Sequence, residues 1–197
     1  MTESAGYAHV RAPTPLRYTV SMSQWRYKKR KQHIVVVGLV AVVLATLTFI
    51  VMRDNGLRFL DGVNLIFHEA GHLIFFFLPG ILVAFAGTFV QLAVPIACVA
   101  HFLGRGARVA ALVALWWVGE SLVNVSIYIA DARVQVLPLL GNGEHDWAYI
   151  LGTLGVLEYD TVIASLVSFL GLGAMIGATA GTAWHAHRLA QGARAVR

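Results

Sequence analysis

Long apolar runs divide the chain into segments that match the thickness of a lipid bilayer. Four of them cover residues 33–52, 81–103, 107–130 and 161–184. An α-helix needs about 20 apolar residues to cross the hydrocarbon core, and each run has roughly that length. A fifth run, Leu65–Leu78, reaches only about 21 Å as a helix and falls short of the roughly 30 Å core. The pattern predicts four membrane-spanning helices and one shorter helix.

The composition supports a membrane protein. Hydrophobic residues make up 58% of the 197 residues and charged residues only 13%, whereas soluble domains carry about 25% charged residues. The chain is therefore predicted to be an all-α integral membrane protein. Its single cysteine, Cys98, excludes an intrachain disulfide and a metal site built from several thiolates.

Basic residues distinguish two topologies for the short apolar run. Three groups of Lys and Arg lie at the ends of apolar runs, at positions 26–31, at positions 105 and 108, and at positions 188, 194 and 197. If Leu65–Leu78 spans the membrane, the chain has five spans and the groups fall on both sides. If it is re-entrant and turns back at Pro79-Gly80, four spans remain and all three groups share one side. Cytoplasmic loops are enriched in Lys and Arg, so four spans plus a re-entrant or half helix is favoured over five spans.

The same rule assigns both ends of the chain. Residues 1–32 are polar and contain Pro13 and Pro15, which predicts a disordered basic tail in the cytoplasm. Residues 33–184 form the membrane domain, and residues 185–197 form a second basic cytoplasmic tail. We expect an uncleaved anchor in a plasma membrane, such as the bacterial inner membrane. The basic groups are interpreted as topology signals, so no nucleic-acid partner is expected.

The segment His68-Glu69-Ala70-Gly71-His72 lies within the short apolar run and indicates metal chemistry. On a helix, His68 and His72 project from one face, and Glu69 lies beside them. Two imidazoles at this spacing bind zinc in metalloproteases, and the carboxylate between them activates a water molecule. Ionisable residues at membrane depth are costly and are usually functional. A catalytic zinc site also needs a third protein ligand.

Three parts of the chain offer that third ligand. The first is the segment that contains His145 and Asp146, which follows a glycine-rich turn. In the four-span topology this segment lies on the same side as the residues that lead into the motif helix, so the two can meet. The second is Glu120, in the middle of an apolar run. Asn124 follows it at the spacing that thermolysin-like enzymes use for a glutamate ligand and a later acid. The third is Asp131, which lies beside Arg133 at the end of that run.

We predict His145 or Asp146 as the third ligand and Glu120 as the alternative. Acids that do not bind the metal are candidates for hydrogen bonds to the outer nitrogens of the ligating histidines, because ligating imidazoles usually donate their second N–H. Asn124 and Asp131 are predicted in this supporting role.

The hydrophobic motif helix in a small chain with several spans resembles the site-2-protease-like intramembrane zinc metalloproteases. In that family the motif helix supplies two ligands and the base, and an aspartate on a later segment supplies the third ligand. The resemblance implies that His68 and His72 bind Zn²⁺, that Glu69 is the base, and that Asp146 matches the third ligand by residue type. The function implied is an endopeptidase that cleaves membrane-anchored polypeptides.

Two other functions are compatible with the same residues. One is an inactive metal-binding accessory or scaffold subunit, and the other is a small metal or proton transporter in which Glu120, Gln91 and Asn124 line a path. The last span also carries Gly173, Gly177 and Gly181 at four-residue spacing, which predicts close helix packing within the bundle. A homodimer contact is the alternative interpretation of this glycine stripe.

Overall fold

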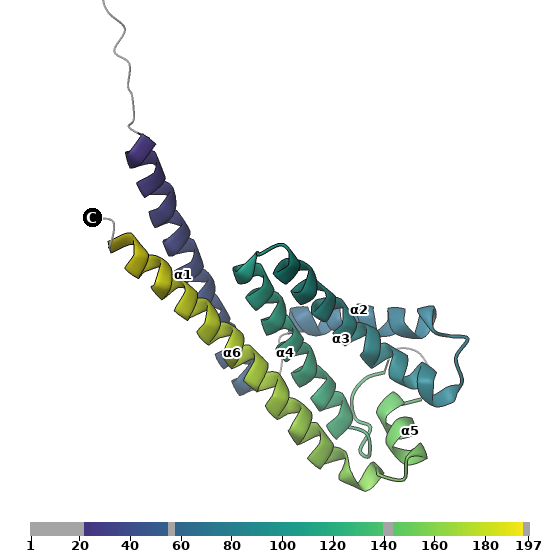
Figure 1. The fold of residues 1–197 in the computed structure, drawn as a ribbon. Helices are drawn as coiled ribbons and strands as arrows, with labels where there is room; N and C mark the ends of the chain where they lie inside the picture. Colours follow the sequence, from purple (N-terminus) through teal and green to yellow (C-terminus); the bar gives the residue numbers. More distant parts are fainter. Residues whose placement is uncertain (1–21, 55–57, 140–143, 195–197) are drawn as a thin grey trace, which may run out of the picture.

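The computed structural model describes residues 22–54, 58–139 and 144–194, and these residues are almost entirely helical (Figure 1). The chain order is α1 (Met22–Asp54), α2 (Arg58–Ile74), α3 (Gly80–Gly104), α4 (Arg108–Ala130), α5 (Asp146–Thr153), the 3₁₀ turn η1 (Leu157–Tyr159) and α6 (Asp160–Arg194). The described residues contain no strand. The predicted all-α membrane fold is confirmed.

Four helices are long and apolar enough to cross a bilayer, and they correspond to the four predicted runs: α1, α3, α4 and α6. Helix α2 has 17 residues, which corresponds to about 26 Å and is short of the hydrocarbon core. The outer faces of α1 and α6 expose large apolar side chains such as Leu39, Phe49, Leu166 and Phe169. Such faces suit contact with lipid tails and would be unfavourable in water.

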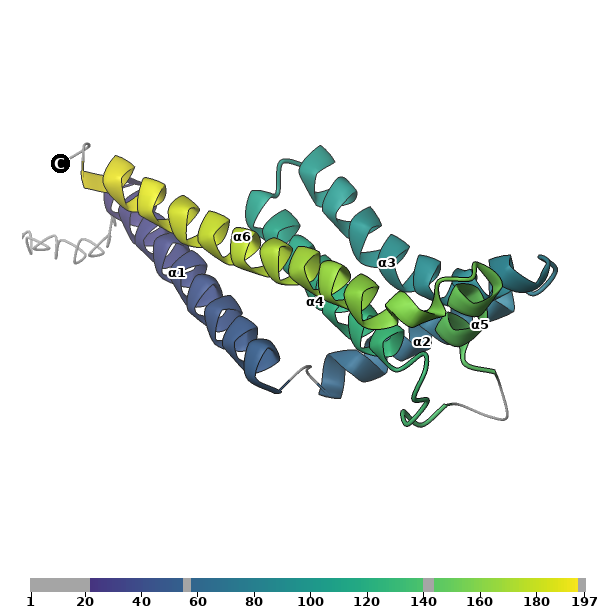
Figure 2. The same cartoon turned by 90° about the horizontal axis from the view of Figure 1, so that it is seen from below.

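The arrangement of the helices matches the four-span topology. The beginning of α1, the α3–α4 turn and the end of α6 lie towards one side of the bundle (Figures 1 and 2). Helix α5 and the end of α2 lie towards the other side. If α2 crossed the membrane, the α3–α4 turn would lie opposite the beginning of α1. Helix α2 instead forms a hairpin with α3, and Pro79 is the residue that precedes α3.

Several predicted boundaries were wrong. Helix α1 begins at Met22 and α6 continues to Arg194, so residues 22–32 and 185–194 are helical rather than tails. Lys, Arg and Ala are strong helix formers and extend a span beyond its apolar part. Residues 1–21 and 195–197 lie outside the described residues. Helix α2 begins at Arg58, seven residues before the short apolar run, because polar residues such as Asn64 find partners in the bundle.

Helix α4 lies between α3 and α6 and forms the centre of the bundle (Figure 2). Its close contact with α6 depends on Gly119 and Gly171, since a Cβ on either residue would lie within 2.6 Å of the carbonyl oxygen of the other. Within the predicted stripe, Gly173 and Gly177 have no atom within 4 Å of such a Cβ, and only Gly181 meets α4, at Leu112. The stripe therefore does not form the packing face. Its role in a homodimer stays a prediction.

Candidate metal centre

The motif helix is held against α3 by small residues. A Cβ on Gly71, the glycine inside the motif, would collide with the Ala86 carbonyl group and would lie 2.8 Å from the Cα atom of Gly87. The absence of side chains at these positions lets the two helices approach closely. Because Gly71 faces α3, the flanking residues His68 and His72 project along the edge of that contact. His68 is buried and His72 is half-buried.

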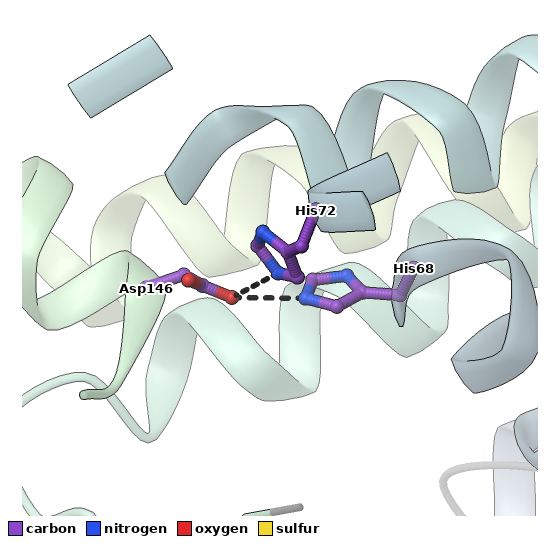
Figure 3. Close-up of side chains that lie close together, drawn as sticks. All are labelled: His68, His72 and Asp146. Atoms are coloured by element: carbon purple, nitrogen blue, oxygen red, sulfur yellow. Dashed lines mark hydrogen bonds and ion pairs between the residues drawn. The ribbon is translucent and has the colours of Figure 1, made fainter. Parts of the chain in front are cut away.

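Asp146 brings a carboxylate to both imidazoles. Its Oδ2 atom lies 2.9 Å from Nε2 of His68 and 3.2 Å from Nε2 of His72 (Figure 3). Tetrahedral zinc with bonds of about 2.0–2.2 Å separates its ligand atoms by roughly 3.3–3.6 Å. The three atoms form a ligand triangle in which the two separations from Asp146 are slightly shorter than in such a zinc site, and all three atoms lie within 4.8 Å of one another. Among the described residues, this is the His, Cys, Asp and Glu cluster with ligand atoms close enough to share an ion.

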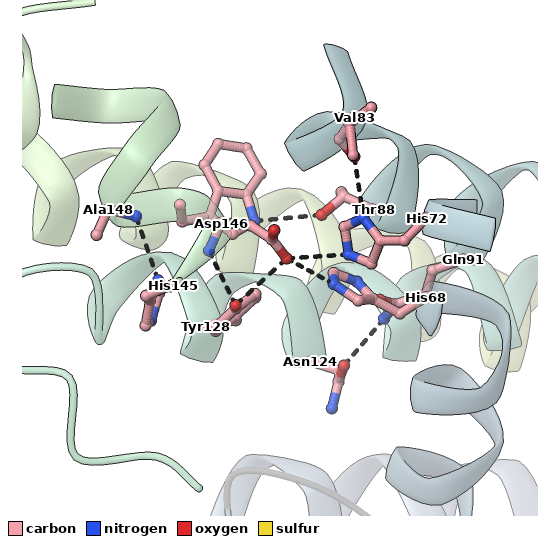
Figure 4. Close-up of polar contacts among 11 residues, drawn as sticks. His68, His72, Val83, Thr88, Gln91, Asn124, Tyr128, His145, Asp146 and Ala148 are labelled. Carbon is pink, nitrogen blue, oxygen red and sulfur yellow. Dashed lines mark hydrogen bonds and ion pairs between the residues drawn. The ribbon is translucent and has the colours of Figure 1, made fainter. Parts of the chain in front are cut away.

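The start of helix α5 positions Asp146. His145 is the residue before the helix, and its Nδ1 accepts a hydrogen bond from the backbone N–H of Ala148 at 3.2 Å. The backbone N–H of Asp146 donates to the Tyr128 hydroxyl group at 3.1 Å, and this hydroxyl group donates to Oδ2 at 3.3 Å (Figure 4). The carboxylate is thus fixed through its own backbone and through α4.

The outer nitrogen of His72 determines which nitrogen faces the metal position. Its Nδ1 lies 3.0 Å from the carbonyl oxygen of Val83 on α3, where an Nδ1–H group donates (Figure 4). In the neutral ring, Nε2 then carries the free lone pair, and Nε2 is the atom that faces Asp146. A carbonyl group that fixes the ligating nitrogen in this way is a common feature of metal-binding histidines.

Gly87 gives an independent test of whether a metal ion fits. An added Cβ at Gly87 would lie 2.6 Å from Nε2 of His68 and 2.7 Å from Nε2 of His72. Any larger residue here would fill the space beside the two ligand atoms. The chain has glycine at the α3 position that faces them, so the donor set and the space around it both suit a small ion.

The electrostatics of the cluster favour an ionised aspartate. Burial opposes ionisation of Asp146, but the hydrogen bonds from His68 and His72 outweigh it and lower the pKa of Asp146 to about 2. The hydrogen bond with Asp146 in turn raises the pKa of His72 above its ordinary value, against the opposing effect of burial. A proton on Nε2 of His72 and a metal ion would therefore compete for the same nitrogen atom.

Metal binding is expected to weaken as the pH falls. Zinc binds the neutral imidazole and must displace the His72 proton, and this proton is held up to a pH above the ordinary value of about 6.5. Below the raised pKa, protonation of His72 alone should reduce zinc affinity by about tenfold for each pH unit that the pH falls. Asp146 stays ionised over this range. Zinc titrations of the purified chain between pH 6 and 8 would measure this slope. An affinity that is constant across this range would contradict the expectation.

The other predicted ligands lie away from the histidine pair. Nε2 of His145 is buried, lacks a hydrogen-bond partner in the described part of the chain, and lies 3.4 Å from Oδ2 of Asp131. Glu120 accepts a hydrogen bond from Asn64 at 2.9 Å, and Asn64 lies one turn of α2 before His68. Neither residue points into the ligand triangle. The alternatives to Asp146 as third ligand thus have other partners in this structure.

The predicted supporting role of Asn124 and Asp131 does not match the observed contacts. Asn124 donates to Asp61 at 3.0 Å and accepts from Gln91 at 2.9 Å. The Asp131 carboxylate accepts two backbone N–H groups, those of Val136 and Leu137. A backbone carbonyl group in α3 contacts His72 instead. The pattern of acids along the sequence does not contain that information, because every residue has a carbonyl group.

Tyr128 belongs to the site although no sequence motif indicates it. Its hydroxyl group contacts Asp146, and its ring lies edge-on to His68 with a centroid distance of 5.7 Å. One signal was present: Glu120, Asn124 and Tyr128 follow each other at four-residue spacing. They therefore lie on one face of α4, the face towards α2.

A cavity of about 990 Å³ opens beside the cluster. Its lining includes His68, the half-buried Glu69 and His72 from α2, and Tyr128 from α4. Further lining residues come from the segment after α4, from α3, and from α5 with the residues just before it. Among them are Leu137, Pro138, Leu139, Val83, Glu144 and Tyr149. The predicted base therefore shares one accessible space with the three candidate ligands. The space is large enough for several residues of an extended peptide.

No family model, curated protein or solved structure matches the chain.

Proposed function

We propose that the chain is a zinc-dependent endopeptidase that cleaves membrane-anchored polypeptides. The single observation that carries the proposal is the convergence of Nε2 of His68, Nε2 of His72 and Oδ2 of Asp146 at the wall of a cavity that also contains Glu69. In this proposal His68, His72 and Asp146 hold Zn²⁺. The bound ion would supply a Lewis acid for the substrate carbonyl group and make a water molecule acidic near neutral pH.

The residues around the cavity would carry out proton transfer, ligand positioning and substrate binding. Glu69 accepts a proton from the attacking water and returns it to the leaving amine, because it is the acid in the cavity beside the ligand pair. Tyr128 and the Val83 carbonyl group hold Asp146 and His72 in position. The apolar lining at Leu137–Leu139 gives the substrate side chains a surface to bury.

The membrane arrangement supports a substrate that comes from the bilayer. Helix α2 is shorter than the four spans, and it pairs with α3 at the end of the bundle opposite the basic residues. With these basic residues in the cytoplasm, as the positive-inside rule requires, the cavity opens towards the extracytoplasmic side. A helical substrate has to unwind locally there, since a carbonyl group that is hydrogen-bonded in a helix is poorly available for attack.

Metal removal tests the proposal directly. The purified chain, reconstituted in liposomes with a single-span reporter polypeptide, is expected to cleave the reporter, to lose cleavage after chelation, and to regain it when Zn²⁺ is added back. A zinc-free wild-type protein, or cleavage that persists after complete chelation, would refute the zinc-peptidase assignment. Zinc binding without cleavage of any reporter would favour the accessory-subunit alternative. Zinc flux across the liposome membrane would favour the transporter alternative.

A further inference from the structure

The two ends of the molecule differ sharply in charge. Apart from Glu3, every acidic side chain of the chain lies at 54–69, at Glu120 or at 131–160, so residues 22–53, 70–119 and 161–194 contain no Asp or Glu. Two cations near the acids form ion pairs: Arg53 lies 3.7 Å from Asp54, and Arg133 lies 2.7 Å from Asp160. At the opposite end, where α1 begins and α6 ends, all the charged side chains that the structure describes are cationic.

At this end, α1 and α6 lie side by side and extend beyond the α3–α4 turn (Figures 1 and 2). A cavity of about 420 Å³ lies between them. Three cationic residues line it, Arg30 and Lys31 from α1 and Arg194 from α6. The Arg30 guanidinium group reaches across to α6, since a Cβ on Gly192 would lie 2.8 Å from its Nη2 atom. Two helices thus bring like charges to one place.

Such a cluster needs an anion from outside the described protein. The acids at the far ends of the two helices are too distant, because Arg30 and Asp54 are separated by about 36 Å along α1. Like charges that face each other repel, and the repulsion is stronger beside a bilayer than in open water. A bound phosphate group would reverse the sign of this energy.

The other residues that line the cavity indicate which kind of molecule carries the anionic group. Apolar residues line the rest of the wall, Ile34 and Val35 from α1 and Ala190 and Ala193 from α6. Tyr27 completes the lining, and the Lys31 ammonium group lies 4.8 Å from the centre of its ring. Two exposed tryptophans frame the cations along the helices, and each stacks with a cation. Trp25 lies five residues before Arg30 in α1, and Trp184 lies ten residues before the end of α6. Tryptophan is enriched at the headgroup level of membranes. The site therefore offers cations at headgroup depth and hydrocarbon immediately below.

We infer that this α1–α6 cavity binds an anionic phospholipid, with the phosphate on Arg30, Lys31 and Arg194 and an acyl chain along Ile34 and Val35. Basic pockets between membrane helices bind such headgroups in general. The lipid bridges α1 and α6, so it joins the beginning of α1 to the end of α6 at the side opposite the metal centre.

Native mass spectrometry of the full chain tests this inference, with phosphatidylglycerol and phosphatidylcholine as probes. The wild-type protein is expected to retain phosphatidylglycerol and to prefer it over phosphatidylcholine. A variant with Arg30→Gln, Lys31→Gln and Arg194→Gln should lose roughly fivefold in affinity per removed cation. The matched control carries Arg26→Gln, Lys28→Gln and Lys29→Gln, which remove the same charge outside the cavity lining. It should bind phosphatidylglycerol almost as the wild type does.

A second pair of variants leaves all charges in place. Ile34→Trp fills the cavity and should abolish retention, whereas Val36→Trp, at an exposed position on the same helix, should not. This pair decides the question if the triple variant does not fold. Equal losses in cavity variants and controls, or equal binding of both lipids, would overturn the inference. Inorganic phosphate that binds as tightly as phosphatidylglycerol would also overturn it, because the acyl chain would then contribute nothing.

Discussion

Glu69→Gln is expected to abolish peptide cleavage and to leave zinc binding intact. Glutamine keeps the size of the side chain and its hydrogen-bonding capacity but cannot accept a proton from water. General acid–base catalysis contributes about 10²–10⁴-fold to rates, so the variant should lose at least about a hundredfold in cleavage of a membrane-anchored reporter. The zinc content should not change, because the three candidate ligand atoms belong to His68, His72 and Asp146.

Glu144 offers a matched control in the same cavity. Glu144 is an exposed acid in the cavity lining that also contains Glu69, and it lies outside the ligand cluster. Glu144→Gln removes the same charge from the same space and should retain most of the activity. If both variants lose activity equally, the effect is one of cavity charge rather than of a base. Full activity in Glu69→Gln would remove Glu69 from the mechanism.

The membrane spans were predictable because the length of each apolar run can be counted in the sequence. The runs at 81–103 and 107–130 correspond to α3 and α4 to within one residue at each end, and the Pro79-Gly80 break lies where α3 begins. The beginning of α2 was not predictable in the same way. Asn64 looks like a loop residue, yet it is fully buried because Glu120, Trp117 and Ser121 satisfy its polar atoms. The order of polar and apolar residues does not reveal which residues of another helix will form hydrogen bonds with a given side chain.

In the candidate site, too, the sequence does not show which neighbouring residue makes a contact. His145 and Asp146 are neighbours, and the sequence could not separate them as third ligands. The backbone of His145 is extended at φ −72° and ψ 108°, and Asp146 is the first residue of α5. This change of conformation sends the two side chains in different directions, one to Asp131 and the other to the histidine pair. The motif itself needed no such information, because the helical period alone places His68 beside His72.

Asp146→Ala is expected to reduce zinc affinity by at least about a hundredfold. Loss of a residue that only supports a metal ligand costs about 10–100-fold, and loss of a ligand that carries the anionic charge of the site should cost more. The truncation leaves two imidazoles, whose Nε2 atoms lie 2.9 and 3.2 Å from the deleted carboxylate oxygen. Zinc content after dialysis, and competition with a chromophoric chelator, would measure the change.

Two variants distinguish a lost ligand from a disturbed fold. His145→Asn removes an imidazole but keeps a side chain that can accept the Ala148 N–H, because asparagine is a preferred residue before a helix. Glu120→Gln keeps an acceptor for Asn64. Both variants should bind zinc as the wild type does if Asp146 is the third ligand. If zinc instead survives Asp146→Ala and is lost in His145→Asn, the imidazole must turn from Asp131 towards the metal, and the carboxylate contact would be a feature of the metal-free site alone.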